Sequence, residues 1–136
     1  MTRYPIRIGA RSRLFLRIAF GVTPERAFVD VGEETILVRF GRFELSAPLA
    51  SATRWRIEGP WSWITAIGVR MSLRHRDITF GGSPHGGVRM DFVERVRVGP
   101  LRVPALYVTV DDLEGFAAAL TERGIPGVDA RTRIVP

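Results

Sequence analysis

The sequence predicts a mainly β fold of about seven antiparallel strands, in a rolled sheet or partly open barrel, capped by one C-terminal amphipathic helix. Three observations lead to this prediction. Apolar and polar residues alternate along most of the chain, which is the pattern of strands with one buried face. Glycine and proline residues interrupt the alternation at intervals, as turns do. Apolar residues recur at helical spacing only after Val110.

The alternation divides the first half of the chain into strands and turns. Apolar residues at every second position over 14–22 predict a first strand, and a proline-containing turn follows at 23–26. Further strands are predicted over 29–31 and 36–45, where a phase shift of one residue at Gly41 indicates a β-bulge. Residues 1–13 form an N-terminal arm or an extra strand, because Ile6 and Ile8 alternate as well.

The second half continues in the same way. Strands are predicted over 53–58, 63–73, 78–80, 88–98 and 106–110. Glu94 interrupts the apolar phase of its strand, which indicates a bend there. The glycine-rich stretch Gly81–Gly87 predicts a mobile hairpin loop; an anion site built from its backbone amides is the alternative.

The helix is predicted over 111–124. Asp111 is the expected N-cap with Glu114 as its capping-box partner, and Gly124 and Pro126 end the helix. Its apolar stripe, which should be buried on the strands, consists of Leu113, Phe116, Ala117 and Leu120. The expected organisation is one domain over 1–136, with the β barrel or sheet over 14–110, the helix over 111–124 and a tail over 125–136.

The composition excludes several classes of protein. A chain of 136 residues is expected to form a single domain, and the absence of cysteine excludes disulfides, thiolate metal sites and a cysteine nucleophile. The best apolar run, over 14–22, is too short to cross a bilayer, and no signal peptide is apparent. The predicted location is cytoplasmic, with peripheral membrane attachment left open.

Catalytic and cofactor-binding patterns are not apparent in the sequence. The two histidines, His75 and His85, lack the spacing of metal ligands, and no serine lies in a nucleophile-elbow motif. His75 and Asp77 are two residues apart and form the one pair in which a carboxylate could orient an imidazole. The sequence therefore predicts a noncatalytic protein without cofactor or metal.

The charge of the chain is carried by arginine alone. All 20 basic residues are arginine, against 14 acidic residues, which gives a formal net charge of +6 at pH 7. Complete replacement of lysine is typical of a GC-rich bacterial genome, so composition explains part of the excess. A net charge of this sign still attracts anionic partners over long range.

The candidate binding site is a set of arginines on the outward phase of consecutive predicted strands, with Trp61 at a turn beside them. If these strands are neighbours, the side chains share one sheet face that would bind an anionic surface or a partner protein. Glu58 and Asp91 lie on the same phase, so cross-strand ion pairing is the alternative. The eight arginines are Arg54, Arg56, Arg70, Arg74, Arg76, Arg89, Arg95 and Arg97.

The junction from Tyr107 to Leu120, YVTVDDLEGFAAAL, resembles that of bacterial pleckstrin-homology-like (PH-like) domains, in which a strand leads into an acidic-capped helix. The resemblance implies a curved two-sheet barrel plugged by that helix, a noncatalytic binding or assembly role, and homo-oligomer formation. The chain differs from the lipid-binding members in its first loop, which has Arg26 beside Glu25, and in Phe116 where they have tryptophan. A lipocalin-like or helix-grip barrel is the alternative fold.

Three classes of function remain at this stage. The first is a noncatalytic binding or assembly module that recognises an anionic lipid surface or a partner protein through the arginine-rich sheet face. The second is a nucleic-acid-binding protein. The third is a small-molecule-binding cavity protein or an enzyme.

Overall fold

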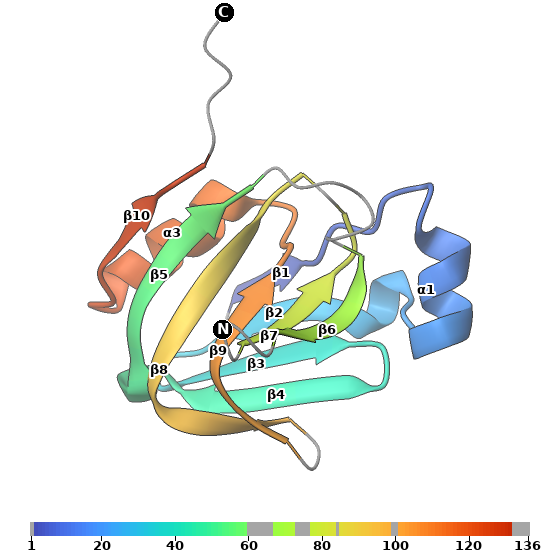
Figure 1. The fold of residues 1–136 in the computed structure, drawn as a ribbon. Coiled ribbons are helices and arrows are strands. Elements are labelled where there is room, and N and C mark those ends of the chain that lie inside the picture. The colour runs from blue at the N-terminus through green and yellow to red at the C-terminus, as the bar shows by residue number, and fades with distance from the viewer. Residues whose placement is uncertain (1, 60–66, 73–76, 84, 99–100, 132–136) are drawn as a thin grey trace, which may run out of the picture.

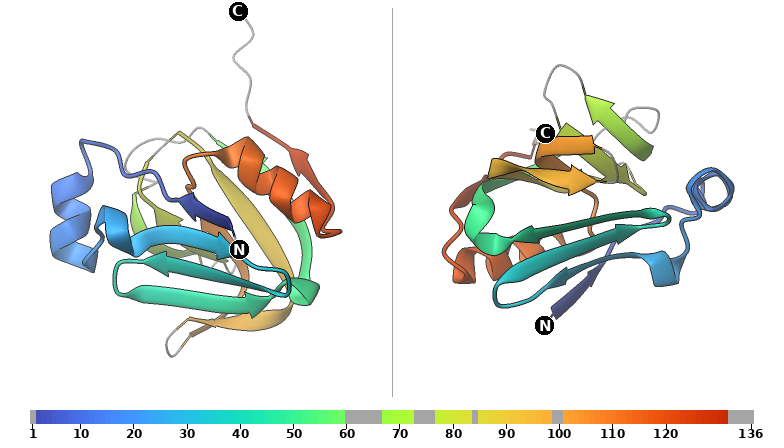
Figure 2. Two further views of the ribbon diagram at one scale, coloured as in Figure 1. Left: turned by 180° about the vertical axis from the view of Figure 1, so that it is seen from behind. Right: turned by 90° about the horizontal axis from the view of Figure 1, so that it is seen from below.

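A computed structural model describes residues 2–59, 67–72, 77–83, 85–98 and 101–131. Two β-sheets face each other, helix α3 covers one end, and helix α1 projects at the opposite end (Figures 1 and 2). The prediction of a mainly β fold is confirmed. Each sheet keeps two edge strands, so neither sheet closes on itself.

The first sheet comes from the N-terminal part of the chain, and all its neighbouring strands are antiparallel. Its strands lie in the order β1 (Thr2–Pro5), β2 (Ala27–Val31), β3 (Thr35–Phe40) and β4 (Phe43–Pro48). Between β1 and β2 lie α1 (Arg13–Phe20) and the short 3₁₀ helix η1 (Pro24–Arg26), and a second 3₁₀ helix, η2 (Leu49–Ser51), follows β4.

The second sheet contains two parallel pairs, which differ from the antiparallel arrangement that the sequence predicts. Its order is β10 (Gly127–Asp129), β5 (Ala52–Glu58), β8 (Gly87–Val98), β9 (Leu101–Val108), β7 (Asp77–Gly81) and β6 (Gly68–Ser72). β9 lies between β8 and β7 and runs parallel to β7, while β10 runs parallel to β5. The described residues thus form ten strands rather than about seven, and β1 and β10 come from the predicted arm and tail.

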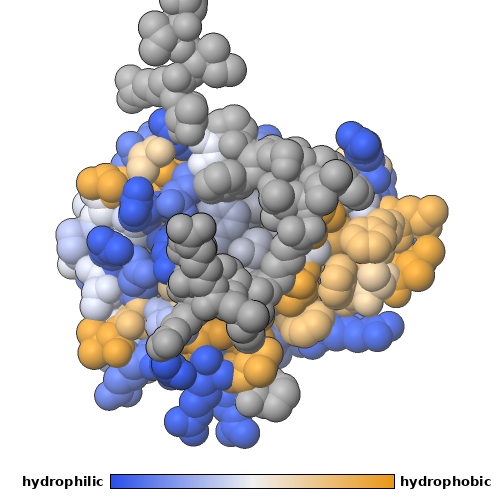
Figure 3. All heavy atoms as spheres, in the orientation of Figure 1, coloured by the Kyte–Doolittle hydropathy of each residue, from blue (hydrophilic) through white to orange (hydrophobic). Residues whose placement is uncertain are grey.

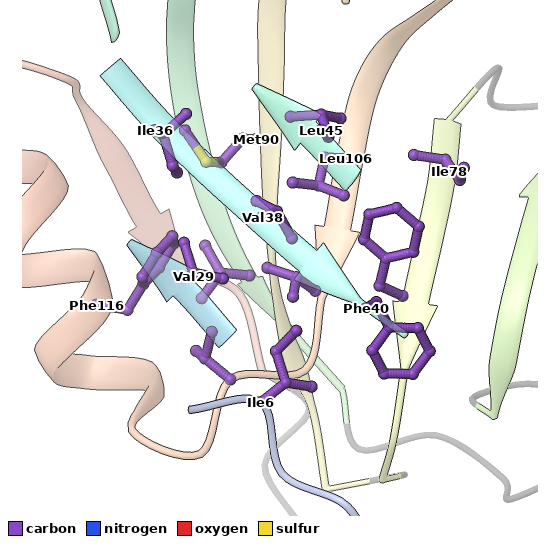
Figure 4. Packing of buried hydrophobic residues seen from close by; sticks show 14 of the residues in the cluster. Ile6, Val29, Ile36, Val38, Phe40, Leu45, Ile78, Met90, Leu106 and Phe116 are labelled. Carbon is purple, nitrogen blue, oxygen red and sulfur yellow. The ribbon is translucent and has the colours of Figure 1, made fainter. Parts of the chain in front are cut away.

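The hydrophobic core fills the space between the sheets (Figure 4). Phe40 on β3 stacks on Phe80 on β7, with ring centroids 5.6 Å apart, which joins the two sheets. The apolar phase predicted for 88–98 is buried throughout, and Glu94 is exposed within a register shift between Asp91 and Val96. Pro104 lies opposite this shift, where its lack of an N–H removes one donor from the ladder.

Helix α3 (Leu113–Glu122) confirms the predicted C-terminal helix and corrects its cap. All four residues of the predicted stripe are buried. The Phe116 ring makes an edge contact with Tyr4 on β1, with centroids 5.4 Å apart. The N-cap is Asp112 rather than Asp111: its Oδ1 accepts a hydrogen bond from the N–H of Gly115 at 3.0 Å, so no Asp111–Glu114 capping box forms.

Residues 13–20 form helix α1, so the strand predicted over 14–22 is wrong. The predicted β-sheet region over 14–110 therefore begins with a helix. Gly21 ends this helix in the left-handed conformation, with φ 69°, and the N–H of Val22 bonds back to the carbonyl of Leu16 at 3.1 Å. The N–H of Gly21 also bonds to the carbonyl of Arg17 at 3.1 Å, which is the αL type of helix ending and favours glycine at this position. Leu16 is the buried residue of the helix.

Two predicted connections also differ. Gly41, with φ 63°, lies in the two-residue turn between β3 and β4, so the predicted β-bulge is a tight turn. A Cβ at this position would lie 2.2 Å from the carbonyl oxygen of Phe20, which requires glycine. Gly81–Gly87 joins β7 to β8 across the intervening β9 and is therefore not a hairpin loop. No helix among the described residues is long and apolar enough to cross a membrane.

Candidate functional site

Three of the predicted site arginines share the outer face of the second sheet. β5 and β8 are neighbours, and their register pairs Arg54 with Asp91 and Arg56 with Arg89. The backbone of Arg70 on β6 lies in the same cross-strand row, three strands away from Arg89. Trp61, Arg74 and Arg76 lie outside the described residues, and so does His75.

Carboxylates pair with Arg54, Arg56 and Arg89 on this face. Arg54 Nε donates to Asp91 Oδ2 at 2.8 Å, and Arg89 Nε donates to the other oxygen of Asp91 at 3.3 Å. Arg89 also reaches over β9 to pair with Asp77 on β7. Ala105, whose methyl group leaves room for this crossing, lies opposite both aspartates.

The result is an alternating chain of charges across the sheet. Arg56 contributes a longer contact of 4.0 Å to Glu58, so three described arginines meet three carboxylates on this face. The side chains of Arg89 and Asp77 are only 17% and 10% exposed. Charges so far removed from water need their partners, so the loss of one partner would destabilise the folded sheet.

Arg95 and Arg97 lie beyond the register shift of β8, in a different setting. Both are exposed, and Arg97 is the cross-strand partner of Arg102 on β9. We call Arg95, Arg97 and Arg102 the cationic hairpin. Like charges placed directly opposite each other repel. The sequence analysis missed Arg102 because it began the last strand at residue 106.

The sequence analysis also missed a surface on helix α1. Leu14, Phe15 and Ile18 are 69%, 49% and 70% exposed, and Figure 3 shows hydrophobic residues gathered at this end of the molecule. Arg13 and Arg17 are exposed on the same helix, one turn apart. We call these five residues the α1 surface. A surface helix ordinarily turns its apolar face to the core, and α1 leaves its apolar face in water.

Positive charge is concentrated around α1. The first 24 residues contain five arginines and no carboxylate. Arg3 and Arg7 pair with Asp30 and Asp111, at 2.7 and 2.6 Å. Within the described residues, Arg13 and Arg17 have no carboxylate partner.

Arg42 adds a further cation at the end of α1. It is exposed, and its side chain lies against Gly21 at the C-terminal end of the helix. A cation there is favoured by the helix dipole.

An open groove lies at the opposite end of the molecule, between α3, β5 and β10. Its volume is about 530 Å³, and its apolar floor includes Trp55, Ile57 and Ala117. Trp55 Nε1 donates to the carbonyl of Ile125 at 3.1 Å, so the indole nitrogen already has a partner. Three carboxylates, those of Glu114, Glu122 and Asp129, are also part of the lining.

The remaining candidates for chemistry lie apart from one another. Asp77, predicted as a possible partner of His75, pairs with Arg89. His85 Nε2 lies 3.0 Å from the carbonyl oxygen of Val110, and partial burial lowers the pKa of His85 from its usual 6.5. Within the described part of the chain, no group of three or more histidine, aspartate or glutamate side chains is placed to hold a metal.

Comparison with known proteins adds no assignment to this arrangement. No model of a known protein family matches the chain, and neither a curated protein nor a solved structure does.

Proposed function

We propose that this protein is a noncatalytic binding module that recognises an anionic lipid surface, at the cytoplasmic side of a membrane. The observation that carries the proposal is the segregation of charge. Arg54, Arg56 and Arg89 on the sheet face pair with carboxylates, whereas Arg13 and Arg17 on α1 have no carboxylate partner among the described residues. Further exposed arginines lie on the cationic hairpin. Basic residues near an anionic leaflet contribute about 1 kcal/mol each to binding.

Exposed aliphatic side chains accompany these arginines and favour lipid over nucleic acid. Leu14 and Ile18 lie on α1, and Val93 and Leu101 are exposed on β8 and β9. Single-stranded nucleic acids are held by a cationic groove together with stacking on aromatic rings, whereas membrane interfaces accept aliphatic groups beside basic ones. Nucleic-acid binding is therefore the second candidate.

The PH-like resemblance belongs to the same proposal. In its favour, α3 follows β9 closely and packs its apolar stripe into the core at one end of the two sheets. The parallel pairing of β7 with β9 and the helix before β2 depart from the pattern that the resemblance implies. Assembly into homo-oligomers, which the resemblance also implies, is part of the proposal and can be measured by light scattering.

Co-sedimentation with vesicles tests the proposed function. We expect retention on equimolar phosphatidylcholine and phosphatidylglycerol, little retention on phosphatidylcholine alone, and weaker retention as salt rises. Duplex and single-stranded DNA are measured in the same buffers. Tighter binding to DNA, with a linear fall of log affinity against log salt, would favour the nucleic-acid candidate. Equal retention on both kinds of vesicle would contradict recognition of an anionic surface.

A further inference from the structure

We infer that α1 is the element that enters the membrane: Leu14, Phe15 and Ile18 insert among the lipid headgroups, while Arg13 and Arg17 bind the phosphates. The inference rests on the proposed function and names the part of the molecule that carries it. Its basis is the direction in which α1 presents its side chains.

Leu14 and Ile18 on α1 point away from the rest of the protein, and Phe15 is half-exposed, with its ring in edge contact with that of Phe20 at 6.0 Å between centroids. With 3.6 residues per turn, Leu14 and Ile18 lie one above the other and Phe15 lies beside them. Leu16, which is fully buried, lies on the opposite side and anchors the helix to the core. The exposure of Leu14, Phe15 and Ile18 therefore follows from how the helix is attached. Apolar side chains therefore remain in water beside the exposed Arg13 and Arg17.

The charges of α1 complement an anionic bilayer. Arg13 and Arg17 are four residues apart, so they lie on one flank of the apolar face. The helix carries no carboxylate, and Arg42 adds a cation at its C-terminal end. Basic residues beside an apolar helical face are the pattern of helices that lie in the plane of a membrane interface.

A second copy of the chain fits this face less well. The three apolar side chains expose on the order of a few hundred Å², so a symmetric contact would bury well below the roughly 1,200–2,000 Å² of a stable interface. A two-fold contact would also bring Arg13 and Arg17 towards their own copies, with no carboxylate on the helix to pair with them. A lipid surface needs no such buried area, and its phosphates can pair with Arg13 and Arg17.

The absence of cysteine permits a direct test by single-site labelling. An environment-sensitive fluorophore is attached at Ile18→Cys and, as the control, at Ala50→Cys. Ala50 is exposed in η2. The connection from β4 to β5, which contains η2, lies on the opposite side of the molecule from α1 (Figure 1). On equimolar phosphatidylcholine and phosphatidylglycerol vesicles, the label at position 18 should shift to the blue and be quenched by lipids with a quencher in the acyl chains. The label at position 50 should do neither.

A matched pair of unlabelled variants completes the test. Ile18→Ser should lower the affinity for these vesicles by about tenfold, since it removes one inserted aliphatic side chain. Val128→Ser, at another exposed aliphatic residue, on β10, should leave it unchanged. Both residues are exposed, so both variants should keep the melting temperature of the parent.

The outcomes separate failure of the inference from failure of the proposed function. If the parent binds anionic vesicles but Ile18→Ser binds equally well and the label stays in water, α1 does not insert and only the inference is overturned. If the parent does not bind anionic vesicles, both are overturned. A dimer in solution that Ile18→Ser dissociates, with no response of the label to vesicles, would assign α1 to self-association instead.

Discussion

Replacing Arg89 with methionine tests whether the charges of the outer sheet face form a structural network. Arg89 is the residue that joins Asp77 to Asp91, and the side chains of all three are at most 18% exposed. Methionine keeps much of the length of the apolar stem but leaves Asp77 without this partner. Removing one member of a buried ion pair costs about 3–5 kcal/mol, and we expect a loss in that range.

Arg54→Met is the matched control for this substitution. Arg54 also pairs with Asp91, at 2.8 Å, but its side chain is 59% exposed, so its removal should cost less than about 1 kcal/mol. Urea unfolding gives the free energy of unfolding of each variant. The double variant Arg89→Met/Asp77→Leu should recover most of the loss, since no buried charge is left unpaired. Equal and small effects of Arg89→Met and Arg54→Met would refute the network and make the face a solvated surface.

Three further predictions test the account of the fold. Phe116→Ala should lower the free energy of unfolding by about 3–5 kcal/mol in urea titrations, and a loss below about 1 kcal/mol would mean that α3 does not close the core. Asp112→Ala should cost about 1 kcal/mol and Asp111→Ala less, which thermal unfolding would show; the reverse order would restore Asp111 as the cap. Because the folded state lowers the pKa of His85, stability should be complete above about pH 6.5 and fall as the pH drops below it. His85→Gln should remove that part of the dependence, and an unchanged pH profile would contradict it.

The sequence predicted those elements in which the apolar residues that repeat at helical or strand spacing are the buried ones. The stripe of α3 is buried because its spacing matches one face of a helix that packs on the core, as with Phe116 and Leu120. The alternation over 88–98 was equally informative, since each apolar residue of that phase points into the core. Cap and turn details, such as Asp112 and Gly41, depend on single hydrogen bonds and backbone angles that periodicity does not record.

Helix α1 was mispredicted because most of its large apolar residues are exposed rather than buried. Alternation in this segment suggested a strand, but Leu14 and Ile18 face water and only Leu16 is buried. A rule that places apolar residues in the core therefore assigns the wrong element here. Ser12 before the segment and Gly21 after it are the signals of helix boundaries that the alternation outweighed.

The outer sheet face was predicted in part. The phase of Arg54, Arg56 and Arg89 placed them on one face, as their register now shows. Their charge balance could not be predicted, because Asp77 becomes a partner only through the insertion of β9 between β8 and β7. The order of strands that are far apart in the sequence cannot be predicted from the alternation of apolar and polar residues within each strand.

The most direct test of the central claim compares two double variants of equal net charge. Arg13→Gln/Arg17→Gln changes α1, and Arg54→Gln/Arg56→Gln changes the sheet face; each removes two positive charges. Partition onto equimolar phosphatidylcholine and phosphatidylglycerol vesicles is measured for both. At about 1 kcal/mol for each arginine near the lipid, the α1 variant should lose on the order of 30-fold in affinity, and the sheet variant less than about threefold. Equal losses of affinity would show that only net charge matters. A larger loss for the sheet variant would contradict the claim and indicate that the sheet face is the binding site.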